Sequence, residues 1–346
     1  MNEPIVAISH ANLRHNVSTL SALVAPSEVM LAVKTNAYGH GLIEVSKTAL
    51  EAGASRLAVL EVSAAIALRV AGVVAPLFAW LFDDDEIAAA VEHTVDLGIS
   101  RLEQLSVAGA HGTTAHPAIV HLKIDTGLTR NGATKEQWHA LCREAALLES
   151  QGRVKIVGIW THLADATPQD DADSLEIFDG AVSVARDLGL RPTLLHVGAS
   201  SAGLRFERGR LDAVRFGIAA YGISPFDSPT ATDLGLRPVM TVSAPVTHVS
   251  DDFALVHIGF GHGIVTGDSP ERFVTIGTSD YQVLEVTVDE MRIAPLAKSP
   301  WPISVGERAV IFGEGGPTAE QLGAWCGTIG DEVVTSVSSR IPRTHL

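Results

Sequence analysis

The sequence predicts an α/β fold, a (β/α)8 barrel of the TIM type followed by a mostly-β C-terminal domain. Short, continuous apolar runs alternate with amphipathic helical patterns over the first two thirds of the chain, as expected for parallel strands buried on both faces. After about residue 235 the sequence pattern changes to Val- and Thr-rich segments separated by Gly, Pro and Asp turns. The two sequence patterns indicate two domains.

The apolar runs give the expected barrel strands. Eight βα units favour a closed barrel over an open doubly wound sheet, because no GxGxxG motif follows the first run. Helices are expected in the amphipathic stretches at 42–53, 84–94, 135–150 and 173–189. The expected strands are 29–33, 56–61, 75–81, 94–100, 118–125, 154–162, 193–198 and 213–218.

The remaining segments predict the β domain. We place the barrel at residues 8–235 and the β domain at 236–346, with the boundary near the GLRPVM segment. Residues 1–7 are expected to join the β domain as a strand. The strand-like segments of this domain are 237–250, 253–261, 272–277, 281–294, 308–313 and 332–342.

Composition excludes several function classes. The 346 residues are 46% hydrophobic, so the chain can bury a large core and is not globally disordered. The net charge of −15 opposes binding to nucleic acid and to anionic membranes. Cys142 and Cys326 form no redox or metal pair, and the 14 histidines show no ligand spacing, so no metal is expected. The start lacks a signal-like pattern, which predicts a cytoplasmic protein.

Polar groups cluster where the expected barrel strands end, and barrels carry their functional side chains there. A single lysine, Lys34, directly follows the first run and precedes a turn with Asn, Tyr and His. More polar groups meet at this end than packing alone requires. The others are Lys123, Asp125, Arg130, Thr161, His162, His196, Ser200, Arg215 and the backbone of Gly217 and Ile218.

Five ordered segments sharpen this prediction: AVKTNAYGHG (32–41), HLKIDTGLTRNG (121–132), GIWTHLADA (158–166), LRFERGRLDAVRFGIAAYGISP (204–225) and SRIPR (339–343). They resemble the alanine racemase family, the fold type III enzymes that use pyridoxal 5'-phosphate (PLP). The segments occur in the family's order and span nearly the whole chain. The resemblance implies a PLP-dependent enzyme that acts at the Cα of a small amino acid.

The resemblance also implies roles for individual residues. Lys34 would hold PLP covalently, a role that requires a neutral amine. Arg215 would face the pyridine nitrogen and, because an arginine keeps its proton, would leave that nitrogen unprotonated. His162 would pack on the cofactor. The phosphate would be bound by Tyr38, Ser200 and the amides of Gly217 and Ile218.

A further implied feature is a carbamylated lysine at Lys123, which would hold Arg130 near the cofactor and the substrate carboxylate. The sequence itself leaves open a plain lysine paired with Asp125.

The chain departs from the family where the second catalytic base is expected. The family's racemases take this base from a tyrosine in a Gly-Tyr-Ala-Asp-Gly segment of the partner subunit, which implies a head-to-tail homodimer. Here the segment reads GFGHG (259–263), so the position is Phe260. The three tyrosines lie elsewhere, at Tyr38, Tyr221 and Tyr281.

Three more pocket positions differ from the family. A Cys-Met-Asp segment is replaced by Thr287, Val288 and Asp289, and a C-terminal tyrosine by Ser339. These changes predict a wider, less polar pocket.

Three interpretations remain open. In the first, the chain is an amino-acid racemase or epimerase in which His262 supplies the second proton. In the second, it is a retro-aldolase or decarboxylase, with His162 or Lys34 handling the proton. In the third, it binds PLP without catalysis, which the intact set of Lys34, Arg130, His162 and Arg215 argues against.

Overall fold

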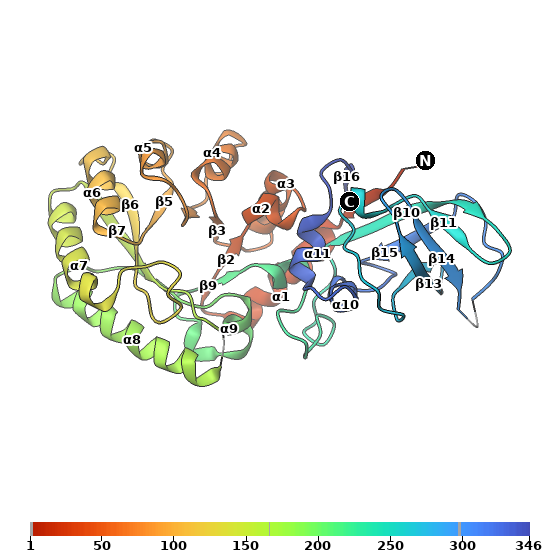
Figure 1. Ribbon diagram of the computed structural model, residues 1–346. Helices are drawn as coiled ribbons and strands as arrows, with labels where there is room; N and C mark the ends of the chain where they lie inside the picture. Colours follow the sequence, from red (N-terminus) through yellow and green to blue (C-terminus); the bar gives the residue numbers. More distant parts are fainter. Residues whose placement is uncertain (1–2, 166, 297–298) are drawn as a thin grey trace. The chain divides into compact units, whose positions relative to one another are not determined.

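A computed structural model describes residues 3–165, 167–296 and 299–346. Residues 1 and 2 of the predicted N-terminal strand and the last residue of the 158–166 motif therefore lie outside the described residues. The chain divides into two compact units (Figure 1). The barrel unit comprises Val17–Lys34 and Ala49–Gly217, and the β unit comprises the remaining described residues.

The barrel unit contains the predicted ring of eight parallel strands, which confirms the fold class. The strands pair in the order β8-β7-β6-β5-β4-β3-β2-β9. The ends of this row are joined through backbone contacts, in which the Arg215 N–H donates to the Gly198 carbonyl at 3.0 Å and the Asp212 N–H to the Leu195 carbonyl at 3.1 Å. The strands are β2 (Glu28–Ala32), β3 (Arg56–Val59), β4 (Leu77–Ala79), β5 (Asp96–Ile99), β6 (Ala118–Lys123), β7 (Val154–Trp160), β8 (Leu194–His196) and β9 (Ala213–Phe216).

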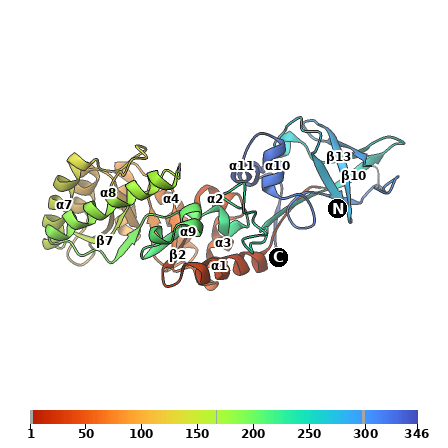
Figure 2. The same ribbon diagram turned by 90° about the horizontal axis from the view of Figure 1, so that it is seen from below.

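Helices connect the barrel strands, and every predicted helix overlaps an observed one. Helix α8 begins before the predicted 173–189 span, because the Thr167 hydroxyl accepts the Asp170 N–H and Pro168 occupies the first turn. Helices α7 and α8 lie side by side (Figure 2). The helices up to β9 are α1 (His10–Val24), α2 (Lys34–Tyr38), α3 (Leu42–Glu51), α4 (Val62–Val70), α5 (Ile87–Glu92), α6 (Leu102–His111), α7 (Lys135–Ser150), α8 (Pro168–Asp187) and α9 (Ser200–Arg205).

The β unit is built on a second eight-stranded sheet, in the order β11-β14-β13-β12-β15-β10-β1-β16. Strand β1 pairs antiparallel with β10 and parallel with β16, so the N-terminal strand belongs to this sheet. The strands are β1 (Ile5–Ile8), β10 (Met240–Val249), β11 (Ala254–Val256), β12 (Phe273–Ile276), β13 (Ser279–Val286), β14 (Met291–Pro295), β15 (Arg308–Phe312) and β16 (Arg343–His345).

The strand predicted at 332–342 is wrong. Its first half forms helix α11 (Gly330–Ser336), which packs against helix α10 (Ala319–Trp325). Val333 and Val334 have high β-propensity, but both are buried in the helical packing. Asp331 and Glu332 favour the helix because acidic side chains stabilise a first turn.

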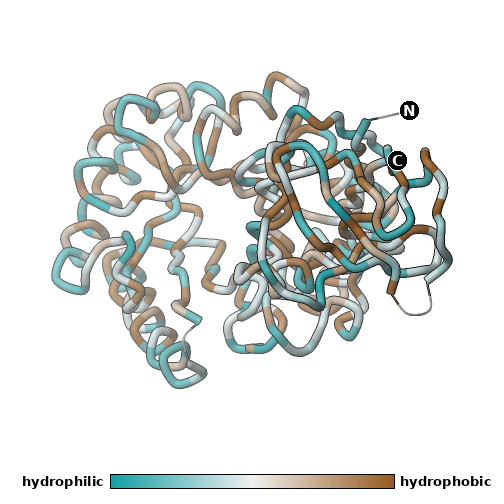
Figure 3. Tube along the Cα trace, turned by 45° about the vertical axis from the view of Figure 1, so that its right-hand side comes forward, coloured by the Kyte–Doolittle hydropathy of each residue, from teal (hydrophilic) through white to brown (hydrophobic). Residues whose placement is uncertain are grey.

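Apolar residues of the strands in both sheets are buried. Figure 3 shows hydrophobic, brown stretches alternating with hydrophilic, teal ones along the chain. Cys142 is fully buried in α7 and is a free thiol, as a core cysteine should be. Within the described ranges, no helix combines the length and the apolar character needed to cross a bilayer.

Candidate active site

The carboxyl end of the barrel unit brings several predicted site residues together. Lys123 ends β6, His162 follows β7 and Arg215 lies in β9. The Arg215 Nη2 donates to His162 Nδ1 at 3.2 Å. Lys123 Nζ and the Arg215 guanidinium carbon lie 4.2 and 5.2 Å from the centre of the Trp160 ring. Both basic groups therefore lie against the same indole ring.

Arg215 is buried and its terminal nitrogens are fully engaged. Nη1 donates to His196 Nδ1 at 2.9 Å and to the His196 carbonyl at 3.0 Å. Nη2 donates to the carbonyls of Thr161 and Val197 at 2.9 and 2.8 Å. Among the contacts of the described residues, only Nε of this guanidinium is not used. Arg215 can therefore offer a ligand one fixed donor.

Burial and mutual repulsion lower the pKa values of the basic groups in this cluster. Burial, followed by the charges of Arg215 and Arg130, lowers the pKa of His162 from 6.5 to about 2. The same causes lower the pKa of Lys123 from 10.5 to about 7. Burial lowers the pKa of Arg215 to about 9. The cluster thus disfavours its own positive charge, which an anionic ligand would offset.

The sequence left open an ion pair between Lys123 and Asp125, but the two side chains have other partners in the loop after β6. Lys123 Nζ donates to the Asn131 side-chain oxygen. The Asp125 carboxylate accepts the backbone N–H groups of Gly127 and Thr129 at 3.1 and 3.0 Å and so closes the turn that leads to Arg130. Asp125 still raises the pKa of Lys123, as the smallest of the four contributions.

The turn after Lys34 is left-handed. Residues 35–38 all have φ between 52° and 55°, a conformation that costs about 1–2 kcal/mol for each non-glycine residue. The His40 Nδ1–H donates to the carbonyls of Ala37 and Tyr38 at 3.0 and 2.9 Å, which holds the turn. The His40 and Tyr38 rings both pack on Tyr221. Burial raises the pKa of Tyr38, so its phenol stays a neutral donor.

Of the other residues predicted to bind the phosphate, Ser200 and Gly217 contact each other. Ser200 starts α9, and its hydroxyl accepts the Gly217 N–H at 3.0 Å. Gly217 ends the barrel unit, and Ile218 starts the last segment of the β unit. The roles expected for these residues and for Tyr38 remain predictions.

In the β unit, the residues predicted to shape the substrate pocket are neighbours. Phe260 lies in the short 3-10 turn η4 (Phe260–His262), and its N–H donates to the Thr287 carbonyl at 2.9 Å. The Gly261 N–H donates to the Val288 carbonyl at 2.8 Å. The side chains of Phe260 and Val288 are 49% and 51% exposed, so both present apolar surface to solvent.

Two glycines make the close approach of this turn possible. A Cβ on Gly259 would lie 2.2 Å from the Thr287 carbonyl oxygen. Gly263 has φ of +81°, and a Cβ there would lie 2.0 Å from the Ser336 carbonyl oxygen. On the other side, the Ser338 N–H donates to the His262 carbonyl at 2.9 Å, which places the Ser339 turn beside the same segment.

His262 takes part in its own turn. Its Nδ1 accepts the Gly259 N–H at 3.2 Å, so the neutral ring carries its proton on Nε2. Burial and then the neighbouring His257 lower the pKa of His262. Tyr221 and Tyr281 are both buried. The Tyr281 hydroxyl donates to the Pro300 carbonyl at 3.1 Å.

Sequence reasoning missed three buried polar residues that support the site or the barrel beneath it. His40 lies in the lysine motif, but its role in a left-handed turn depends on backbone geometry. His121 and Asp96 lie inside the barrel and contact each other at 3.4 Å. A histidine within the apolar run 118–125 was the available signal for the second case.

Comparisons with known proteins agree with this geometry. Residues 8–225 match the family model for the alanine racemase N-terminal domain, and residues 241–345 match that for the C-terminal domain. The chain is 34% identical to an alanine racemase of Beutenbergia cavernae over 96% of this chain and 94% of that protein. A relative in Thermobifida fusca, also named alanine racemase, is 33% identical over 95% and 94% of the two chains.

Solved structures give the same result. Alanine racemase from Streptomyces lavendulae superimposes with a TM-score of 0.92 at 29% identity, covering 100% of this chain and 97% of the other. Alanine racemase from Streptomyces coelicolor gives 0.91 at 31% identity, covering 99% and 98%.

Proposed function

The chain belongs to the alanine racemase family, and from this premise we propose that it is a PLP-dependent enzyme that interconverts the enantiomers of a small amino acid. The observation that carries the proposal is the buried cluster of basic groups at the carboxyl end of the barrel, in which Arg215 donates to His162 and lies with Lys123 against the Trp160 ring. Burial and mutual repulsion lower the pKa values of all three groups. Relatives over the whole length of both domains are named alanine racemases.

The donor set of this chain fits PLP, which carries a phosphate and a phenolate. Lys34 supplies the amine for covalent attachment. Tyr38, Ser200 and the amides of Gly217 and Ile218 are proposed to bind the phosphate. When bound, PLP supplies an electron-withdrawing ring that weakens the bond between Cα of the amino acid and its hydrogen. The free Nε donor of Arg215 suits an unprotonated pyridine nitrogen.

The perturbed histidine favours proton movement at Cα over retro-aldol cleavage. Retro-aldol chemistry would ask His162 to take a hydroxyl proton. Its Nδ1 already accepts from Arg215, and its pKa is about 2, so it is a weak base. His162 is better suited to hold Arg215 in place, while the Lys34 amine moves the proton on one face of Cα.

The second face requires another proton carrier, because Phe260 has none. The proposal assigns this role to His262, two residues further along the same turn. To take up a proton, Nδ1 must release the Gly259 N–H. Exchange on this face is therefore expected to be slower than on the Lys34 face. The exposed side chains of Phe260 and Val288 make the surface around it apolar.

Lys123 is proposed to be carbamylated. A lysine with a pKa of about 7 is partly neutral at physiological pH and can attack CO₂, forming an N–C bond and releasing one proton. The resulting anion would pair with Arg130 and would relieve the repulsion from Arg215. Mass spectrometry under native conditions, with ¹³CO₂ as the source, would detect the label.

The active assembly is proposed to be a head-to-tail homodimer. The cluster formed by Phe260, Val288 and the Ser339 turn is exposed in the single chain. Its position suits a surface that completes the barrel of a second copy. An obligate interface of about 2,000 Å² or more is expected. A stable, fully active monomer in light scattering would exclude this assembly.

Visible absorption tests the cofactor assignment directly. The purified protein should be yellow, and Lys34→Ala should lose the band of the covalently held cofactor without unfolding. Lys155→Ala, a change of an exposed lysine in β7, is a control that should keep the band. A wild-type protein that stays colourless with added PLP would contradict the proposal.

A further inference from the structure

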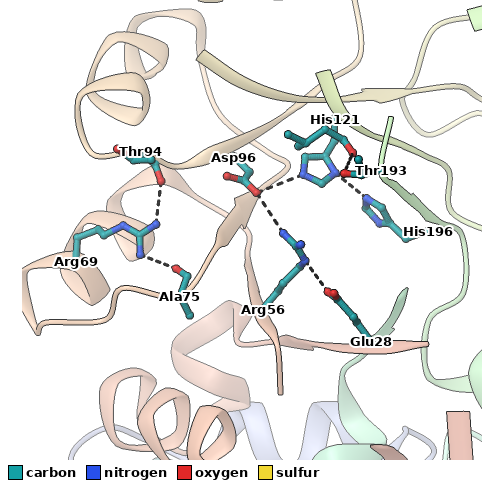
Figure 4. Close-up of polar contacts among 10 residues, drawn as sticks. Glu28, Arg56, Arg69, Ala75, Thr94, Asp96, His121, Thr193 and His196 are labelled. Atoms are coloured by element: carbon teal, nitrogen blue, oxygen red, sulfur yellow. Dashed lines mark hydrogen bonds and ion pairs between the residues drawn. The ribbon is translucent and has the colours of Figure 1, made fainter. Parts of the chain in front are cut away.

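We propose that Asp96, acting through His121 and His196, is a positioning residue for Arg215. The inference rests on the proposed function, since Arg215 is there assigned to the cofactor. The four residues form one buried chain of contacts that runs through the barrel interior. Figure 4 shows its Asp96, His121 and His196 part, together with Arg56 and Glu28 beyond Asp96.

The direction of each hydrogen bond follows from Arg215. Its guanidinium can only donate, so His196 Nδ1 must accept at 2.9 Å. The single proton of neutral His196 is then on Nε2, which donates to His121 Nδ1 at 3.0 Å. His121 in turn keeps its proton on Nε2, which faces the Asp96 carboxylate at 3.4 Å. Burial keeps His196 neutral by lowering its pKa.

The hydrogen-bond relay from Asp96 to Arg215 connects the two ends of the barrel. Asp96 is the first residue of β5, whereas His196 is the last residue of β8. Asp96 also lies 3.9 Å from Arg56, whose Nε donates to Glu28 at 2.8 Å. Parallel strands start at one end of a barrel and finish at the other. The Asp96 carboxylate, at the end where the strands start, is therefore connected through two imidazoles to Arg215, at the end where they finish.

The local fold is built to hold His121 in this place. The β6–β7 ladder shifts register between Val120 and His121, and such irregularities re-aim side chains. Residue 158 on the neighbouring strand is glycine, and a Cβ there would lie 2.1 Å from His121 Nδ1. The Phe78 ring packs against His121 with a centroid distance of 4.8 Å, and the Trp160 ring stacks on His196 at 5.8 Å.

The hydrogen-bond relay supplies the buried Arg215 cation with a negative charge, that of Asp96. The five acceptors of Arg215 in the described structure are three carbonyl oxygens and two imidazole nitrogens, all of them neutral. Asp96 is the carboxylate at the end of the relay. Its charge strengthens each hydrogen bond in turn, since polarised chains of hydrogen bonds are cooperative in a low-dielectric interior. Asp96 therefore favours the same tautomers that Arg215 requires and fixes the orientation of Arg215.

The test compares two charge-removing changes along the same network. Asp96→Asn removes the carboxylate and can present an amide N–H to His121 Nε2, so that only the Arg215 end of the relay still favours the observed tautomers. Glu28→Gln is the matched control, because it removes the carboxylate that pairs with Arg56 on the side away from the histidines. Arg56 can only donate hydrogen bonds, so its role toward Asp96 does not change. Histidine ¹⁵N spectra of the unliganded proteins report the tautomers. Titration with PLP, followed by visible absorption, reports cofactor affinity.

We expect unprotonated Nδ1 on His196 and His121 in the wild type and in Glu28→Gln, with equal PLP affinity. In Asp96→Asn the tautomers should be mixed, and PLP should bind about 10-fold more weakly. Wild-type PLP affinity in Asp96→Asn would overturn the inference. A protonated Nδ1 on His196 in the wild type would also overturn the inference, and this measurement does not depend on the folding of a variant. If the wild type binds no PLP, the proposed function fails, and the tautomers alone decide the inference.

Discussion

Replacing Gly158 with alanine should destabilise the barrel far more than a typical glycine-to-alanine change. The new Cβ would lie 2.1 Å from His121 Nδ1 and 2.8 Å from its Cε1, so the imidazole must leave its site. Forcing a side chain into a packed core costs about 1–3 kcal/mol. The His196 Nε2–H, fully buried, then loses its acceptor at a cost of about 1–3 kcal/mol. The expected loss is about 2–6 kcal/mol in the free energy of unfolding.

Chemical denaturation measures this loss, and Gly180→Ala is the matched control. Gly180 lies in α8, where an added Cβ meets nothing within 4 Å, so alanine there should stabilise by about 0.5–1 kcal/mol. Adding His121→Ala to Gly158→Ala removes the clash, and the double variant should be less destabilised than the sum of the two single changes. Stability of Gly158→Ala equal to that of the wild type would refute the reasoning.

Three further predictions concern protons. The folded chain releases the Lys123 proton near pH 7 and the unfolded chain near 10.5, so unfolding takes up a proton between these values. The free energy of unfolding should therefore rise with pH by at most about 1.4 kcal/mol per pH unit. Lys123→Met should remove this rise below pH 9, where the pKa of Arg215 begins to contribute, when both proteins are measured in CO₂-free buffer. Phe260→Tyr restores a second acid–base group and should raise alanine racemisation by up to about 10²-fold, limited by the altered pocket; an unchanged rate in a folded dimer argues against a role for this position. His262→Ala should abolish inversion but keep Cα exchange from the Lys34 face, whereas undiminished racemisation would remove His262 from the mechanism.

The barrel could be predicted from the sequence because its strands carry their own signal. Continuous apolar runs are typical of strands buried on both faces, and all eight runs overlap strands in the structure. The 332–342 segment shows the limit of this approach. Val333 and Val334 favour a strand locally, but packing against α10 makes the segment a helix. Local propensity could not supply that tertiary contact.

The positions of Lys34 and Lys123 at strand ends could be predicted from the apolar runs that precede them, and the structure has both residues there. The Asp96–His121–His196 relay could not be predicted, because its members come from three strands far apart in sequence. Only the register of neighbouring strands, including the shift at His121, brings their side chains together. The glycine in VKIVGIW was a signal for a close approach, but the sequence could not name the side chain that fills the space.

The central claim is that this chain moves a proton at the Cα of an amino acid. Single enantiomers of a panel of amino acids, beginning with L-alanine, should be incubated with the purified protein and PLP in D₂O. Chiral chromatography and mass spectrometry then report the enantiomer ratio and the deuterium at Cα. The account predicts formation of the opposite enantiomer with one deuterium at Cα, and loss of this activity in Lys34→Ala. Release of CO₂ or an aldehyde without inversion, or no exchange at Cα for any amino acid tested, would contradict it.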